Sequence, residues 1–126
     1  WLGDGAAPPP AATAGNGAGH PLIDVGRVQR FRDDYPEIAE RLVALFADTT
    51  PPLIEQLSNA VHGGEDDAVR RLAHKLKGSC ENVGATRMGT LCRQLEEPGA
   101  RAVALVDEIA AIYPATLAEI RDVLTG

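Results

Sequence analysis

The chain has 126 residues, 44% of them hydrophobic and 4% aromatic, and a formal net charge of −6 at pH 7. This length gives room for one small core, which alanine and aliphatic side chains must fill. The negative charge argues against nucleic acid or an anionic membrane as the main partner. No apolar run approaches the ~18 residues of a membrane span, and no signal peptide opens the chain, so we expect a cytoplasmic location without direct membrane contact.

Residues 1–21 are dominated by glycine, alanine and proline. Such a stretch has too few large apolar side chains to offset the entropy lost on ordering. It predicts a disordered interdomain linker, or alternatively a terminal tail, before one domain over residues 22–126. Because the chain starts with Trp1 and not with methionine, we expect it to be a piece of a longer protein.

From residue 23 onward the sequence carries the helical period, without a convincing period-2 strand pattern. A short helix is expected over residues 24–32, and a second helix begins at Pro36. Thr50 followed by Pro51 predicts the start of a further helix, which Gly63 and Gly64 end. The side chains expected to face inward from these helices are Val25, Val28, Phe31, Ile38, Leu42, Leu45, Phe46, Leu53, Ile54, Leu57 and Val61.

The second half of the chain continues the helical pattern. A helix over residues 66–83 ends at Gly84, and Thr86 is a plausible N-cap for a helix through Glu96. The last pattern, over residues 103–124, carries an inward stripe that starts at Val103, and Pro114 is expected to kink this helix or to split it in two. The sequence therefore predicts an all-α fold, an antiparallel up-down four-helix bundle with a short additional N-terminal helix.

One histidine stands in an unusual setting, in the sequence His-Lys-Leu-Lys-Gly-Ser of residues 74–79. At about 100° per residue, His74 shares one helical face with Arg70, Lys77 and Gly78, opposite an apolar face. Lys75 and Lys77 are the only lysines, and half of the twelve Lys and Arg residues lie between Arg70 and Arg93, Arg71 among them. A solvent-facing imidazole ringed by positive charge suits a transient phosphate carrier.

Glu96 is expected to lie near His74, because the two residues stand at comparable distances from the Gly84 turn of a helical hairpin. Its carboxylate can then accept the Nδ1 proton and leave the Nε2 lone pair free to attack phosphorus. The alternatives are that Glu96 is only a solvated residue near a helix end, or that Gln94 takes this role. The two cysteines, Cys80 and Cys92, are expected to be buried free thiols.

Residues 74–79, 82–85 and 91–96 together resemble the histidine-containing phosphotransfer (HPt) domains of multistep phosphorelays. The resemblance covers residues 22–124 and implies a helical bundle that carries a phosphohistidine between response-regulator receiver domains. It implies that His74 is the phosphoacceptor and that Glu96 orients the imidazole. Lys75, Lys77, Gly78, Arg70 and Arg71 would then contact the phosphate or the partner. A linker before such a domain fits the C-terminal module of a hybrid sensor histidine kinase.

The resemblance also implies what the domain needs from outside. Receiver domains are the expected partners, with Mg²⁺ bound only on the receiver, no metal or other cofactor on this chain, and a monomeric domain. The chain would be a phosphocarrier without catalytic activity of its own, although its parent can be a membrane-anchored kinase. An exposed apolar strip near His74, formed with the short first helix, is the expected docking patch.

Two other functions stay open on the sequence alone. One is the phosphoacceptor domain of a chemotaxis-type histidine kinase, which shares the bundle and the histidine but takes phosphate from an ATP-binding domain. The other is a non-catalytic helical adaptor, against which the paired lysines and the mid-helix Gly78 argue. No phosphate-cradling loop, Ser/His/Asp set or nucleotide motif indicates an independent enzyme.

Overall fold

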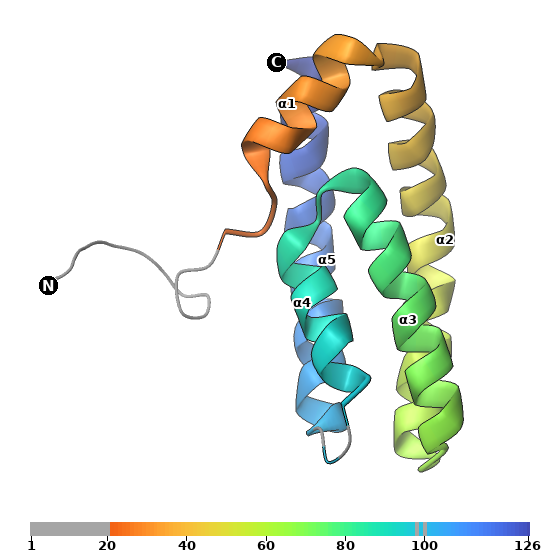
Figure 1. The fold of residues 1–126 in the computed structure, drawn as a ribbon. Helices are drawn as coiled ribbons and strands as arrows, with labels where there is room; N and C mark the ends of the chain where they lie inside the picture. The colour runs from red at the N-terminus through yellow and green to blue at the C-terminus, as the bar shows by residue number, and fades with distance from the viewer. Residues whose placement is uncertain (1–20, 98, 100) are drawn as a thin grey trace, which may run out of the picture.

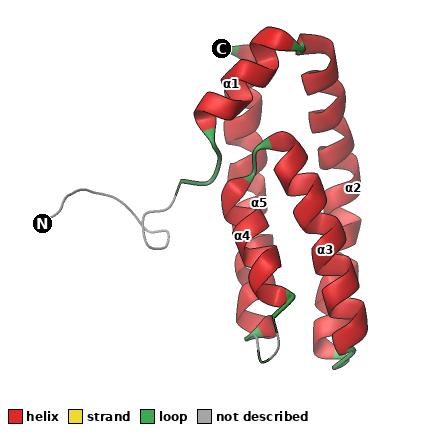
Figure 2. Ribbon diagram, in the orientation of Figure 1, coloured by secondary structure: helices red, strands yellow, loops and turns green. Residues whose placement is uncertain are grey.

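The structure, a computed structural model, describes residues 21–97, 99 and 101–126. The predicted linker of residues 1–21 therefore lies outside the described residues, except for Pro21. The elements are α1 (Val25–Asp34), α2 (Pro36–His62), α3 (Asp66–Val83), α4 (Thr86–Leu95) and α5 (Ala102–Thr125). Within the described part of the chain all regular secondary structure is helical (Figure 2).

The second to fifth helices form a closed bundle. α2 packs on α3, α3 on α4, α4 on α5, and α5 on α2 again. Consecutive helices run in opposite directions, and α1 crosses one end, where it contacts α2 and α5 (Figure 1). The predicted antiparallel up-down four-helix bundle with a short first helix is confirmed. No described helix is both long and apolar enough to cross a membrane.

α2 is a single helix of 27 residues that passes through Pro51 and Pro52, so the helix start predicted at Thr50 is wrong. Each proline lacks an N–H and leaves the carbonyl four residues earlier without its helical partner. The hydroxyl of Tyr113 on α5 donates to one of these, the Ala47 carbonyl, at 3.4 Å. Burial raises the pKa of Tyr113, which keeps this donor protonated. Tertiary packing therefore holds the helix together where local sequence favours an end.

α5 likewise runs unbroken through Pro114, so of the two outcomes predicted for this proline the split is wrong. The carbonyl that Pro114 leaves without a helical partner belongs to Ala110, which is exposed. Water can pair with a carbonyl at such a position, so the proline costs this helix less than it would in a buried one.

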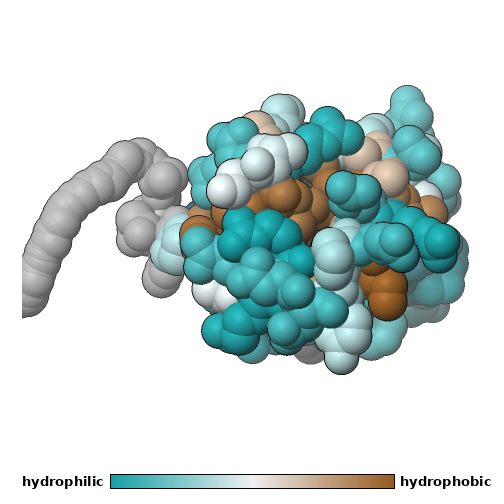
Figure 3. Space-filling view, turned by 90° about the horizontal axis from the view of Figure 1, so that it is seen from above, coloured by the Kyte–Doolittle hydropathy of each residue, from teal (hydrophilic) through white to brown (hydrophobic). Residues whose placement is uncertain are grey.

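The core contains most, but not all, of the side chains predicted to face inward. Val28, Phe46, Leu53 and Leu57 are buried, as are most of the apolar residues of α3 and α4. Four expected core residues are instead exposed: Val25 (44%), Ile38 (49%), Leu45 (55%) and Val103 (49%). α2 is longer than the 18-residue α3, so α3 leaves one side of the first turns of α2 open. Figure 3 shows apolar surface among hydrophilic residues at this end.

Gly84 fixes the turn that sets α3 against α4. Its φ of +78° is left-handed, and a Cβ at this position would lie 2.8 Å from the Val28 side chain. The Asp24 amide donates to the Gly84 carbonyl at 3.0 Å, and the Asp24 side chain caps α1. Only glycine suits this close, left-handed position. The start of α1 is thereby tied to the α3–α4 hairpin that carries the site.

Candidate functional site

His74 lies in the middle of α3 on its outward face. Its side chain is 72% exposed. Ala73, Leu76 and Cys80, on the opposite face, are fully buried in the bundle. The core packing of α3 therefore holds the helix while the imidazole remains open to a partner.

Glu96, the residue that caps the C-terminus of α4, joins His74 to Lys77. Its Oε1 lies 3.2 Å from His74 Nδ1, and its Oε2 lies 2.9 Å from Lys77 Nζ. The Lys77 contact is ionic rather than a regular hydrogen bond, since Oε2 is buried and has no hydrogen-bond partner of normal geometry. The Glu96 side chain is 24% exposed. It is therefore not the freely solvated residue of the first alternative, and Gln94 makes no such contact with His74.

The protonation state of this group follows from its charges. Lys77 is the main cause that lowers the pKa of Glu96, with His74 contributing in the same direction against the opposing effect of burial. Glu96 is thus an anionic acceptor at neutral pH, and a neutral His74 must donate from Nδ1 to approach Oε1. The Nε2 lone pair is then free, which is the tautomer that a nucleophilic imidazole needs.

The basic residues around His74 divide into two groups. Arg70 pairs with Asp67, and Lys77 pairs with Glu96. Arg71 and Lys75 are exposed and make no ion pair within the part of the chain that the structure describes. The sequence predicted one basic cluster, whereas the structure separates cations that hold carboxylates from cations that are available to a partner.

Gly78, one turn after His74, is not required by the packing of the free domain. A Cβ at this position would meet nothing within 4 Å. Side chains on a helix lean toward its N-terminus, so a side chain at Gly78 would cover the surface beside His74. The glycine leaves this surface bare at a cost in helix propensity of about 1 kcal/mol.

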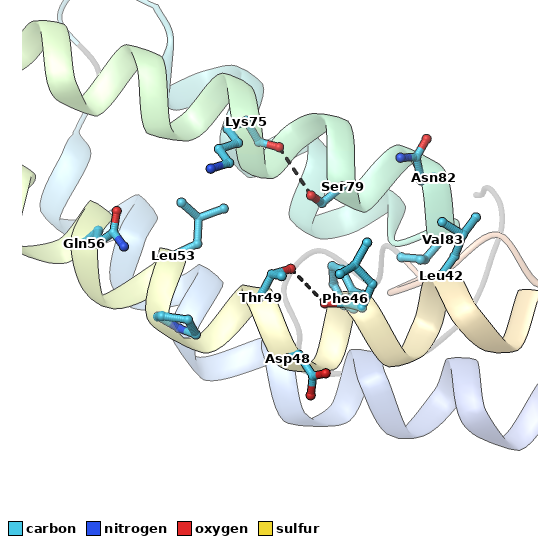
Figure 4. A pocket seen from close by; sticks show the side chains of 12 residues that line it. Leu42, Phe46, Asp48, Thr49, Leu53, Gln56, Lys75, Ser79, Asn82 and Val83 are labelled. Carbon is cyan, nitrogen blue, oxygen red and sulfur yellow. Dashed lines mark hydrogen bonds between the residues drawn. The ribbon is translucent and has the colours of Figure 1, made fainter.

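A groove of about 400 Å³ runs between α2 and α3 beside the site. Leu42, Phe46 and Leu53 contribute apolar walls, and Lys75 extends from α3 over the gap toward α2 (Figure 4). The Lys75 carbonyl accepts a hydrogen bond from Ser79 Oγ at 3.5 Å. The groove beside His74 is thus lined by α2 and α3, and a neighbouring hollow that shares Leu42, Asn82 and Val83 with it is lined in addition by α1.

The polar α2 residues of this groove were missed by the sequence analysis. They are Asp48, Thr49 and Gln56, and the apolar Pro52 lines the groove beside them. A signal was present, because Leu42, Leu45, Thr49, Pro52 and Gln56 recur at spacings of three and four, which places them on one face of a helix. The predicted helix start at Thr50 divided this face between two elements and hid it.

The remaining candidate groups have structural roles. Cys80 and Cys92 are buried free thiols, as predicted. A hydrogen bond with Cys92, together with burial, raises the pKa of the Cys80 thiol, so it is a poor nucleophile. His62 Nδ1 lies 2.8 Å from the Ser58 carbonyl at the end of α2. Among the described residues no group of three or more His, Cys, Asp and Glu side chains could hold a metal ion.

Comparison with known proteins identifies the family to which this arrangement belongs. A family model described as the Hpt domain matches residues 41–124, more than half of the chain. No curated protein matches the sequence. Among solved structures, the chain is similar to the histidine-containing phosphotransfer domain of ArcB from Escherichia coli, with a TM-score of 0.75 and 16% identity, over 82% of this chain and 93% of that chain. At this identity the likeness shows the shared fold. The chain therefore belongs to the Hpt domain family and is a histidine phosphotransfer module of a His-Asp phosphorelay.

Proposed function

We propose that this domain carries a phosphoryl group on Nε2 of His74, taken from the aspartyl phosphate of one receiver domain and passed to another. The observation that carries the proposal is the exposed imidazole whose Nδ1 faces the Glu96 carboxylate at 3.2 Å. This contact selects the tautomer with a free Nε2 lone pair and fixes the plane in which it points. Membership of the Hpt family gives the class of partner, since HPt domains interact with receiver domains.

The transfer is a displacement at phosphorus. The Nε2 lone pair forms the N–P bond while the bond between phosphorus and the receiver's carboxylate oxygen breaks, which returns a free aspartate. The Nδ1 proton stays on the ring, and the positive charge that develops on the imidazole faces Glu96. Lys77 keeps that carboxylate ionised and in place. Any Mg²⁺ would belong to the receiver, and we propose that this domain has no catalytic activity in isolation.

The receiver docks, in this proposal, along the groove between α2 and α3. The groove has apolar walls and leads to Lys75, the residue after His74. The exposed side chain of Leu45 extends the same surface along α2. An apolar patch beside the reacting atom buries area on docking without covering the atom itself. Partner choice would then depend on α2 as much as on α3.

The test is phosphotransfer from a phosphorylated receiver domain, read as acid-labile, base-stable label on this chain. His74→Gln should abolish the label, while the matched control His62→Gln should keep it. The same assay with the ATP-binding domain of a chemotaxis-type kinase in place of the receiver tests the alternative role. Label that appears on His74 only with this kinase domain would favour the phosphoacceptor of a chemotaxis-type kinase over the phosphorelay module. Absence of label on His74 from every phosphorylated receiver and kinase would refute the proposal and favour the adaptor.

The setting of the domain in its cell remains part of the proposal. We propose that it acts as a monomer in the cytoplasm, as one module of a hybrid sensor histidine kinase, without contact to nucleic acid. The net charge of −6 argues against contact with nucleic acid. The glycine-, alanine- and proline-rich residues before the bundle suit a linker to other modules of a longer chain. Size-exclusion chromatography with light scattering of the bundle at micromolar concentration tests the monomer directly.

A further inference from the structure

We infer that Arg71, and not Lys77, is the side chain that neutralises the phosphoryl group on His74, on the side of α3 that faces α2. The inference rests on the proposed function. The imidazole of His74 points its two ring nitrogens toward different sides of α3. Nδ1 faces Glu96 at 3.2 Å, on the α4 side of α3. The two ring nitrogens point in widely different directions, so Nε2 and anything bound to it point away from α4.

The cations on the α4 side of α3 are already occupied. Lys77 Nζ lies 2.9 Å from Glu96 Oε2. Arg70 pairs with Asp67 and lines a hollow together with Glu97. For Lys77 to reach the phosphoryl group it would have to leave Oε2, a buried oxygen that has no hydrogen-bond partner. Leaving a buried charged atom unpaired is costly, so Lys77 is held in its present role.

The opposite arc of α3 carries Arg71, Gly78 and Lys75. Lys75 lines the groove shared with α2, which shows the direction that this arc faces. On a helix of about 100° per residue, Arg71 lies roughly 60° around from His74 and Lys75 roughly 100° in the same sense. Gly78, roughly 40° around in the same sense and one turn after His74, presents no side chain, and Arg71 stands about one turn before His74. The space beside Nε2 on this arc is therefore open, and a cation borders it.

Arg71 also suits the phosphoryl group in position and chemistry. The His74 side chain leans toward the N-terminus of α3, over the turn that contains Arg71. Arg71 is exposed and makes no ion pair with any described residue, because Asp67, the carboxylate one turn before it, is bound to Arg70. A guanidinium presents a planar fork that matches two phosphoryl oxygens. Lys75 lies further around α3 toward α2 and lines the proposed docking groove.

The test uses phosphoramidate as a small donor, so that receiver docking plays no part. The Nε2–P bond forms as the N–P bond of the donor breaks and ammonia leaves. Phosphorylation of His74 in the full chain is followed by mass spectrometry, at low and high salt, for the native sequence, Arg71→Gln, Arg71→Lys, Lys77→Gln and the matched control Arg70→Gln. Arg71→Gln and Arg70→Gln remove the same charge from adjacent residues of one helix.

We expect Arg71→Gln to slow phosphorylation roughly three- to fivefold and to remove most of its salt dependence, with partial recovery in Arg71→Lys. Arg70→Gln should change the rate less than about twofold, the scale of an exposed pair. Equal rates and salt dependence in Arg71→Gln and the native chain would overturn the inference, as would loss of salt dependence in Lys77→Gln instead. Failure of the native chain to accept phosphate on His74 from either this donor or a receiver is a different result and would refute the proposed function itself.

Discussion

Gly78→Ala should stabilise the fold and impair its function. Gly78 lies in the interior of α3, is exposed, and would present its new Cβ to open space, with nothing within 4 Å. Alanine is favoured over glycine in a helix interior by about 1 kcal/mol, because glycine loses more conformational entropy on folding. No clash opposes that gain in the free domain, so we expect the free energy of unfolding to rise by about 1 kcal/mol.

The same methyl group would stand where a receiver must approach His74. Side chains on α3 lean toward its N-terminus, so the alanine side chain covers surface beside the imidazole. Displacing an aspartyl phosphate by about 1 Å from its reactive geometry can cost a factor on the order of 10² in rate. We therefore expect receiver-dependent phosphotransfer to fall at least about tenfold, while transfer from the much smaller phosphoramidate falls less.

Gly84→Ala is the matched control, because the same substitution is expected to lower the free energy of unfolding at this position. Gly84 has φ +78°, and its Cβ would lie 2.8 Å from the buried Val28 side chain. The left-handed backbone costs about 1–2 kcal/mol for alanine, and the overlap adds about 1–3 kcal/mol. Urea unfolding followed by circular dichroism measures both variants. A Gly78→Ala domain that is less stable than the native one would refute the reasoning, since the glycine would then serve the fold.

Three further predictions concern groups around the site and the bundle interior. Thr50 Oγ1 is buried without a hydrogen-bond partner, so Thr50→Val should raise stability by about 1 kcal/mol in the same unfolding assay; a loss would mean that the hydroxyl is satisfied. Tyr113→Phe removes the donor to the Ala47 carbonyl and should lower stability by about 1 kcal/mol, whereas no change would show that water replaces it. Because Lys77 lowers the pKa of Glu96 in the folded state, the stabilisation from Glu96 is complete above the ordinary glutamate value of about 4.3 and is lost as the pH falls through the folded value. The stability difference between the native chain and Glu96→Gln should therefore shrink below about pH 4, and a difference that grows on acidification would contradict the ion pair.

The sequence predicted the fold best where local signals and tertiary packing agree. The helix over residues 66–83 begins and ends as expected, because acidic residues open it and Gly84 can close it with a left-handed turn. The break expected at Pro51 is absent, because the Ala47 carbonyl that this proline leaves free accepts a hydrogen bond from Tyr113, 66 positions further along the chain. A local pattern holds no information about such a distant donor.

In the site, too, the local sequence does not determine which contacts single side chains make in the packed bundle. The outward direction of His74 follows from the helical period. The position of Glu96 beside His74 follows from their similar distances from the turn of the hairpin, so both could be predicted from the sequence. Lys75 and Lys77 look alike in the sequence, yet they lie roughly 160° apart around α3. One lines the groove toward α2 and the other pairs with Glu96. That division depends on which neighbouring helix lies on each side, and only the packed bundle determines it.

The separation of the two lysines bears on how a carrier can be both reactive and reversible. A phosphoryl group that is passed on must not be bound tightly, and exposed cations such as Arg71 and Lys75 stabilise an anion by only about 0–1 kcal/mol each in water. The imidazole, in contrast, must present one nitrogen in one direction, and we propose that the partly buried Glu96, which lies between His74 and Lys77, holds it there. Placing the stronger electrostatic interaction on Nδ1 and the weaker ones near Nε2 orients the nucleophile without trapping the product. On this argument, substitution of Glu96 or Lys77 should change the rates of gain and loss of phosphate together, whereas substitution of Arg71 should shift the balance between them.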